Sequence, residues 1–137
     1  MKKLFLLAPV LFFCSFALRA QKDYKVVFDL TSGDSLSQQT AIRWATEVSN
    51  ADPDAQVEIV MFGKGLPLAV KDRSAVADAV TSLATKKNVS FKVCAIAMAN
   101  QKINKDQLLP GVQTVPDGIY EIMSKQRQGW GYIKVAH

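Results

Sequence analysis

Short apolar runs recur along the chain and are separated by turn residues and by amphipathic stretches. Residues 24–30 and 56–62 are rich in valine, isoleucine and phenylalanine, which is typical of buried strands. Residues 89–95 alternate apolar and polar side chains with a period of two, which also predicts a strand. Shorter apolar segments at 112–115 and 132–135 predict a fourth and a fifth strand.

Between these runs, apolar residues recur at spacings near three and four, which predicts helices packed on a core. Ser35 and Gln38 have the spacing of a capping box, so a first helix should begin there. Its apolar face contains Leu36, Ala41, Trp44, Ala45 and Val48. Later helices are predicted by Val76, Val80 and Leu83, by residues 96–102 and 106–109, and by Ile119, Ile122 and Met123, with Gly129 at the last C-terminus.

The alternation of strands and helices indicates the fold class. It predicts an α/β domain with a mainly parallel sheet and helices on both faces, because parallel strands are joined by crossover helices. We therefore expect one flavodoxin-like layered domain over residues 21–137, with its strand order left open. A chain of 137 residues is long enough for one such core and too short for two.

The first twenty residues do not belong to this pattern. Lys2 and Lys3 precede an apolar run over residues 4–18, and Arg19 and Ala20 lead into a polar segment. This is the layout of a secretory signal peptide, so we expect cleavage after Ala20 and a periplasmic or secreted mature protein. The run is shorter than the roughly 20 residues of a spanning helix, so we expect no stable membrane anchor.

Loss of this segment changes the charge and the cysteine count. It removes three of the 17 basic residues and no acidic one, so the formal net charge falls from +5 to +2. The densest remaining basic stretch, Lys86–Lys87, is too short for a nucleic-acid footprint, and we expect no such partner. Cys14 is lost with the signal, which leaves Cys94 alone and excludes an intramolecular disulfide.

Candidate binding residues follow from topology, because open α/β sheets bind ligands at the carboxyl ends of their strands. The segment 31–34 and the stretch 63–65 follow the first two strands. Gly33, Gly63, Gly65 and Asp29 are therefore candidate ligand-binding residues. Turn geometry also explains the glycines, and a role as a strand-end cap also explains Asp29.

Cys94 is the candidate nucleophile, because it ends the third strand at the same edge. It shares the less apolar register with Ser90 and Lys92. A helix that starts directly after it would place backbone N–H groups near the sulfur, and such groups stabilise a thiolate. The alternative is that Cys94 is a small buried hydrophobe, which is common for free cysteines.

Other residues offer less chemistry. His137 is the single histidine and the last residue, a poor place for a general base. Residues 62–65 lack the full phosphate-loop pattern, and the ligands for a zinc site are missing, so we expect no metal and no cofactor. We expect Trp44 to lie in the core, and Trp130 and Tyr132 to lie in the core or in a subunit contact.

An ordered series of segments is similar to a known family. The series comprises Val-Cys-Ala at 93–95, Ile-Asn-Lys-Asp-Gln-Leu-Leu-Pro-Gly-Val at 103–112, Val-Pro-Asp-Gly-Ile-Tyr-Glu at 115–121, and Gln-Gly-Trp-Gly-Tyr-Ile-Lys at 128–134. With Met-Phe-Gly-Lys-Gly-Leu at 61–66, it resembles the DsrE/DsrF-like family over nearly all of residues 24–135.

The resemblance implies a small α/β fold that commonly forms homotrimers or homohexamers. Relatives include cytoplasmic sulfur-relay proteins, in which a cysteine accepts sulfur as a persulfide and passes it to a partner. Cys94 matches that cysteine in position. An exported member would need different donor and acceptor proteins.

Two functions are therefore open. The chain is either a sulfur or redox carrier that works through a Cys94 persulfide, or a non-catalytic oligomeric module that binds a small ligand or a partner protein. In the second case Cys94 is part of the packing.

Overall fold

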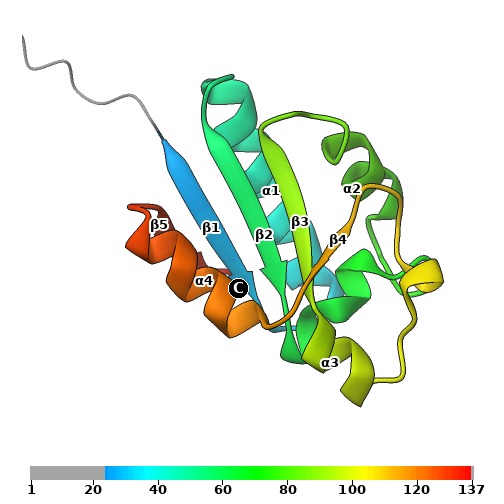
Figure 1. The fold of residues 1–137 in the computed structure, drawn as a ribbon. Coiled ribbons are helices and arrows are strands. Elements are labelled where there is room, and N and C mark those ends of the chain that lie inside the picture. The colour runs from blue at the N-terminus through cyan, green and yellow to red at the C-terminus, as the bar shows by residue number, and fades with distance from the viewer. Residues whose placement is uncertain (1–23, 137) are drawn as a thin grey trace, which may run out of the picture.

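The computed structural model describes residues 24–136, and Figure 1 shows the arrangement of their helices and strands. The expected signal peptide and His137 lie outside the described residues. The elements in chain order are β1 (Lys25–Leu30), α1 (Ser35–Ala51), β2 (Gln56–Met61), the 3₁₀ helix η1 (Gly63–Ala69), α2 (Ala77–Leu83), β3 (Val89–Cys94), α3 (Ala95–Asn100), the 3₁₀ helix η2 (Lys105–Gln107), β4 (Gln113–Val115), α4 (Gly118–Arg127) and β5 (Gly131–Lys134). Among these residues, no helix is long and apolar enough to cross a bilayer.

The five strands form one parallel sheet in the order β4-β3-β2-β1-β5. The chain steps outward from β1 to β4, and then α4 returns across the sheet so that β5 pairs with the free side of β1. Because crossovers between parallel strands are right-handed, a return in the opposite direction places its helix on the opposite face. Figure 1 accordingly shows α4 in front of the sheet and α1 behind it. The predicted α/β class, with helices on both faces, is confirmed.

The two faces of the sheet bury unequal cores. On the face of α1 and η1, a large cluster includes the fully buried side chains of Phe28, Ile59 and Phe91. On the face of α4, a much smaller cluster is formed by Val27, Val60 and Ile122, with Phe62 and Trp130 packed against it. The apolar residues of α1 and of β1 to β3 therefore supply most of the hydrophobic stabilisation.

The start of α1 differs from the prediction. Its N-cap is Asp34, whose carboxylate accepts a hydrogen bond from the Ser37 backbone N–H at 2.9 Å, so the predicted capping box at Ser35 is wrong. Leu36 is 52% exposed, although we expected it in the core. Gln38 is buried instead, because its side chain donates to the Gly33 carbonyl and accepts from the Ala75 N–H.

An ion pair fixes α4 to the sheet. Glu58 of β2 is 1% exposed, and its Oε2 lies 3.1 Å from the Lys125 ammonium and accepts a hydrogen bond from Ser90 Oγ. Lys125 also lies 3.7 Å from Glu121 Oε1 and 4.5 Å from the ring centroid of Trp130. Burial raises the pKa of Glu58, and the ammonium of Lys125 offsets part of that increase.

This burial predicts a specific pH dependence of stability. Since the pKa of Glu58 is raised on folding, the folded protein binds more protons than the unfolded chain in the window above pH 4.5. The free energy of unfolding of the wild type, relative to Glu58→Gln, should therefore fall as the pH rises through that window. Urea unfolding of both proteins from about pH 4 to about pH 8 measures the difference.

Glu47→Gln, on the exposed surface of α1, is the matched control and should show no comparable trend. A difference between wild type and Glu58→Gln that stays constant or grows with pH would contradict the role assigned to burial.

Candidate functional site

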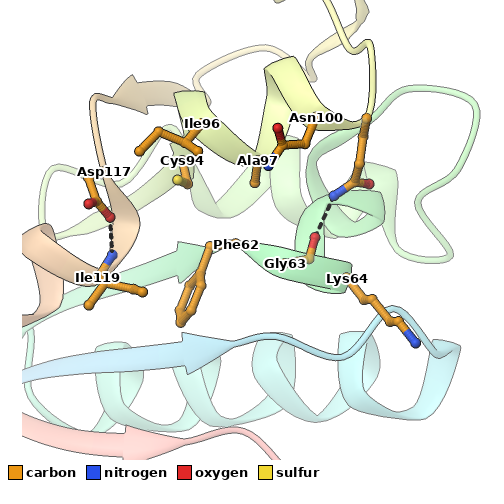
Figure 2. Close-up of a pocket in the computed structure, with 10 residues that line it drawn as sticks. Phe62, Gly63, Lys64, Cys94, Ile96, Ala97, Asn100, Asp117 and Ile119 are labelled. Atoms are coloured by element: carbon orange, nitrogen blue, oxygen red, sulfur yellow. Dashed lines mark hydrogen bonds between the residues drawn. The ribbon is translucent and has the colours of Figure 1, made fainter.

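A pocket of about 450 Å³ opens at the carboxyl edge of the sheet, with Cys94 in its wall (Figure 2). Three parts of the chain supply the lining: the segment after β2, the junction of β3 with α3, and the N-terminus of α4. The lining residues are Phe62, Gly63, Lys64, Cys94, Ile96, Ala97, Asn100, Gln101, Asp117 and Ile119. The predicted convergence of strand ends therefore yields a real cavity.

Cys94 is placed by β3 and α3 together. It is the last residue of β3, opposite Val115 of β4, and it directly precedes the first residue of α3. Within residues 24–136 it is the free cysteine, and it is 5% exposed. The alternation with Ser90 and Lys92 holds as predicted. Cys94 is nonetheless among the residues that line the pocket.

The start of α4 packs directly on this cysteine. A Cβ added to Gly118 would lie 3.1 Å from Cys94 Cβ and 3.2 Å from Phe62 Cβ. Asp117 caps the helix, because its Oδ1 accepts from the backbone N–H of Ile119 at 2.9 Å. A small residue is therefore needed between α4 and β3, and the cap holds the Asp117 carboxylate at the pocket wall.

The walls beside the thiol are mainly apolar. Ile96 and Ile119 line the pocket and are 54% and 57% exposed, and Phe62 lies beside Ile119 and below Ile96 in Figure 2. Among the described residues of the wall, Lys64 is the cation, and its side chain extends away from Cys94 (Figure 2). Gln101 Nε2 donates to the Gly63 carbonyl, so that amide group is already engaged.

The three candidate glycines have different roles. Gly63 lines the pocket and has a φ of +55°, a left-handed conformation that favours glycine. A Cβ on Gly65 would lie 2.0 Å from the Leu30 carbonyl oxygen, and one on Gly33 would lie 2.5 Å from the Lys64 carbonyl oxygen. Gly65 and Gly33 therefore allow the segments after β1 and β2 to pack together, and neither lines the Cys94 pocket. Residues 63–65 are also the start of η1 rather than a separate tight turn.

Asp29 lies outside the pocket and links β1 to β5. It is 5% exposed and accepts a hydrogen bond from the Tyr132 hydroxyl at 2.6 Å, and Lys134 Nζ lies 3.9 Å away. The hydrogen bond to the Asp29 carboxylate raises the pKa of Tyr132 to about 12. The carboxylate that the sequence suggested as a strand-end cap or a ligand-binding acid therefore bonds to side chains of the neighbouring strand β5.

The aromatic residues also have local partners. Trp44 is half-buried against Phe28, with 6.0 Å between ring centroids, and Trp130 lies under the Lys125 ammonium. Within the part of the chain that the structure describes, no group of three or more His, Cys, Asp and Glu side chains is placed to hold a metal ion.

Sequence reasoning did not single out the α4 side of the pocket. The sequence pattern predicts a helix over Ile119 and a short helix from Ile96, with Asp117 just before the first of them. The sequence did contain one indication of this wall. If residues 112–115 form a parallel strand, the segment after them must lie at the same edge of the sheet as Cys94. The very short β4 made that signal weak, because a strand of three residues leaves little periodicity to read.

The two glycines of the β2–η1 segment predict contrasting effects of alanine. Gly65→Ala places a Cβ against a backbone oxygen that cannot move easily, so it should lower the free energy of unfolding by about 3 kcal/mol. Gly63→Ala meets no atom within 4 Å and should cost only the left-handed strain, about 1 kcal/mol.

Urea unfolding of the two variants and the wild type measures both costs. Equal costs for the two substitutions would show that Gly65 is not held against Leu30 as described.

Comparison with known proteins identifies relatives of this arrangement. Residues 25–135 match the model of the DsrE/DsrF-like family. No curated protein matches the chain significantly.

Three solved structures are similar to this fold. A protein of unknown function, MTH1491 from Methanobacterium thermoautotrophicum, is 28% identical with a TM-score of 0.69, over 82% of this chain and 99% of that one. The ychN protein from E. coli is 13% identical with a TM-score of 0.69, over 82% of this chain and 98% of that one. BT1422 from Bacteroides thetaiotaomicron, described as a conserved protein of unknown function, is 13% identical with a TM-score of 0.65, over 81% and 94%.

Proposed function

This chain belongs to the DsrE/DsrF-like family, and from that premise we propose that it carries sulfane sulfur as a persulfide on Cys94. The family is associated with sulfur relay. The observation that carries the proposal is the position of Cys94, a free thiol at the carboxyl end of an interior strand and in the wall of a pocket of about 450 Å³. A thiol in this position can meet a small reactant that enters the pocket.

The chemical cycle needs no metal or redox cofactor. The Cys94 thiolate attacks the outer sulfur of a donor R–S–S–H, the sulfur–sulfur bond of the donor breaks, and R–S⁻ leaves. The product is Cys94–S–S–H, which retains the donor's proton. An acceptor thiolate then attacks the outer sulfur and releases the Cys94 thiolate. One sulfur atom moves in each step, and no electrons are gained or lost overall.

The backbone that follows Cys94 begins a helix. Cys94 occupies the N-cap position of α3, so the N–H groups of the first turn lack partners within the helix. Such groups favour a thiolate or a persulfide anion nearby.

We also propose that the mature protein works outside the cytoplasm as a homo-oligomer. The signal-peptide layout of residues 1–20 supports export. The family resemblance supports assembly, and so do Tyr120 and Met123, which leave apolar side chains on the outer surface of α4 at 64% and 53% exposure. The donor and acceptor would then be extracytoplasmic.

A second function is favoured by one observation. Cys94 is only 5% exposed, and the pocket is lined mainly by apolar side chains, which suits a small-ligand-binding module with a packed cysteine. The two functions differ in whether the native thiol reacts.

Sulfur loading of the native protein is the test. Residues 21–137 and the Cys94→Ser variant are incubated with a persulfide donor at neutral pH, and their intact masses are compared. The wild type should gain one sulfur atom that a reductant removes, and the variant should gain none, because serine cannot form a persulfide.

The control is thiol alkylation with and without urea. The carrier function would be contradicted if the native protein gains no sulfur and Cys94 is alkylated only after unfolding. The ligand-binding module would then be the remaining function.

A further inference from the structure

We propose that the Cys94 pocket selects sulfane sulfur donors that carry an apolar organic group and react in a neutral form, such as organic hydropersulfides as R–S–S–H, over the thiosulfate dianion. This rests on the proposed function, since it assigns the donor class to the same cysteine.

Access to the sulfur passes through the pocket. Cys94 is 5% exposed, and the helix start packs so closely on it that a Cβ added to Gly118 would lie 3.1 Å from Cys94 Cβ. A donor must therefore place its sulfane sulfur inside the cavity, between the walls. A volume of about 450 Å³ admits a small organic molecule or a single side chain.

The walls favour an apolar group on the donor. Ile96 and Ile119 line the pocket together with Cys94 and are each more than half exposed, and Phe62 is a further apolar lining residue. An apolar donor group placed between the two isoleucines removes their side chains from water, which favours binding. The same contact gives a dianion no stabilisation.

The charges of the site disfavour an anion. Lys64, the cation of the described wall, extends away from Cys94, as Figure 2 shows. The Asp117 carboxylate is fixed at the wall by its bonds to the α4 backbone. A dianion that entered would lose hydration, approach a carboxylate and find no side-chain ammonium directed at it.

Sulfur transfer from a hydropersulfide exchanges one sulfur–sulfur bond for another. Cys94–S⁻ and R–S–S–H give Cys94–S–S–H and R–S⁻, so one sulfur–sulfur bond forms as one breaks. Thiosulfate would transfer its outer sulfur with loss of sulfite, and two anions would then have to meet and part inside the apolar pocket. The pocket therefore disfavours thiosulfate twice, when the dianion approaches Cys94 and when sulfite leaves.

The experiment compares initial loading rates by intact mass, with benzyl hydropersulfide and thiosulfate as donors. Each loading rate is divided by the rate at which N-acetylcysteine reacts with the same donor. This corrected rate allows for the difference in intrinsic reactivity between the two donors. The corrected preference is the ratio of the corrected rate with benzyl hydropersulfide to that with thiosulfate. For the wild type it should be at least about tenfold.

Two variants test the cause. Ile119→Lys adds a cation to the wall, and Asp117→Asn removes the anion while it keeps a side chain that caps helices well. Each should shift the corrected preference toward thiosulfate, by about tenfold for Ile119→Lys. Ile133→Lys, which adds the same charge on β5 outside this pocket, is the matched control and should leave the preference unchanged.

The outcomes separate the two levels of the proposal. If neither donor loads Cys94, the carrier function fails and the donor preference fails with it. If both donors load with equal corrected rates, or if Ile133→Lys shifts the preference as much as Ile119→Lys, the carrier function stands and the donor class is wrong. Circular dichroism checks that each variant is folded. If Ile119→Lys does not fold, the effect of Asp117→Asn on the corrected preference tests the role of wall charge.

Discussion

The return of α4 across the sheet is the constraint on which the rest of the structure depends. This helix covers the face opposite α1, and it delivers β5 to the free side of β1. The contact between buried Glu58 and Lys125 fixes the last turn of α4, and the close approach of Gly118 to Cys94 fixes its start. The same path therefore completes the sheet and one wall of the pocket.

The chemistry proposed for Cys94 follows from this arrangement. β3 ends at the thiol, α3 places backbone N–H groups beside it, and α4 limits its exposure to the pocket side. A thiol that is shielded yet open to one cavity can exchange sulfur with a small donor and resist other oxidants. The apolar walls and the fixed Asp117 carboxylate then set which donors approach. The path of α4, the limited exposure of Cys94 and the proposed choice of donor thus depend on the same contacts of α4 with the sheet.

Much of this was predictable from the sequence, and the failures have physical causes. The period-two pattern of β3 correctly placed Cys94 at a strand end, because side chains on a strand must alternate. The strand order was not predictable, since it depends on the direction of the α4 crossover and not on any local pattern. Leu36 was assigned to the core from its spacing, but Gln38 took the inward position through two hydrogen bonds to segments distant from the helix.

The candidate site was only partly predictable for a similar reason. The sequence leaves two explanations for the glycines, ligand binding and turn geometry, and of the three candidates Gly63 lines the pocket. Gly65 is instead required by contact with the backbone of β1, and sequence alone does not distinguish these two uses. Asp117 and Ile119 become site residues only when β4 and β3 are neighbours.

The central claim is that Cys94 both accepts a sulfur atom and yields it while the protein stays folded. The most direct measurement is to load the native protein, remove the donor, add an excess of a small acceptor thiol, and follow both species by mass. The account predicts that the protein returns to its unloaded mass as the acceptor gains one sulfur. A protein that never loads, or that keeps its sulfur until it is unfolded, would contradict the account.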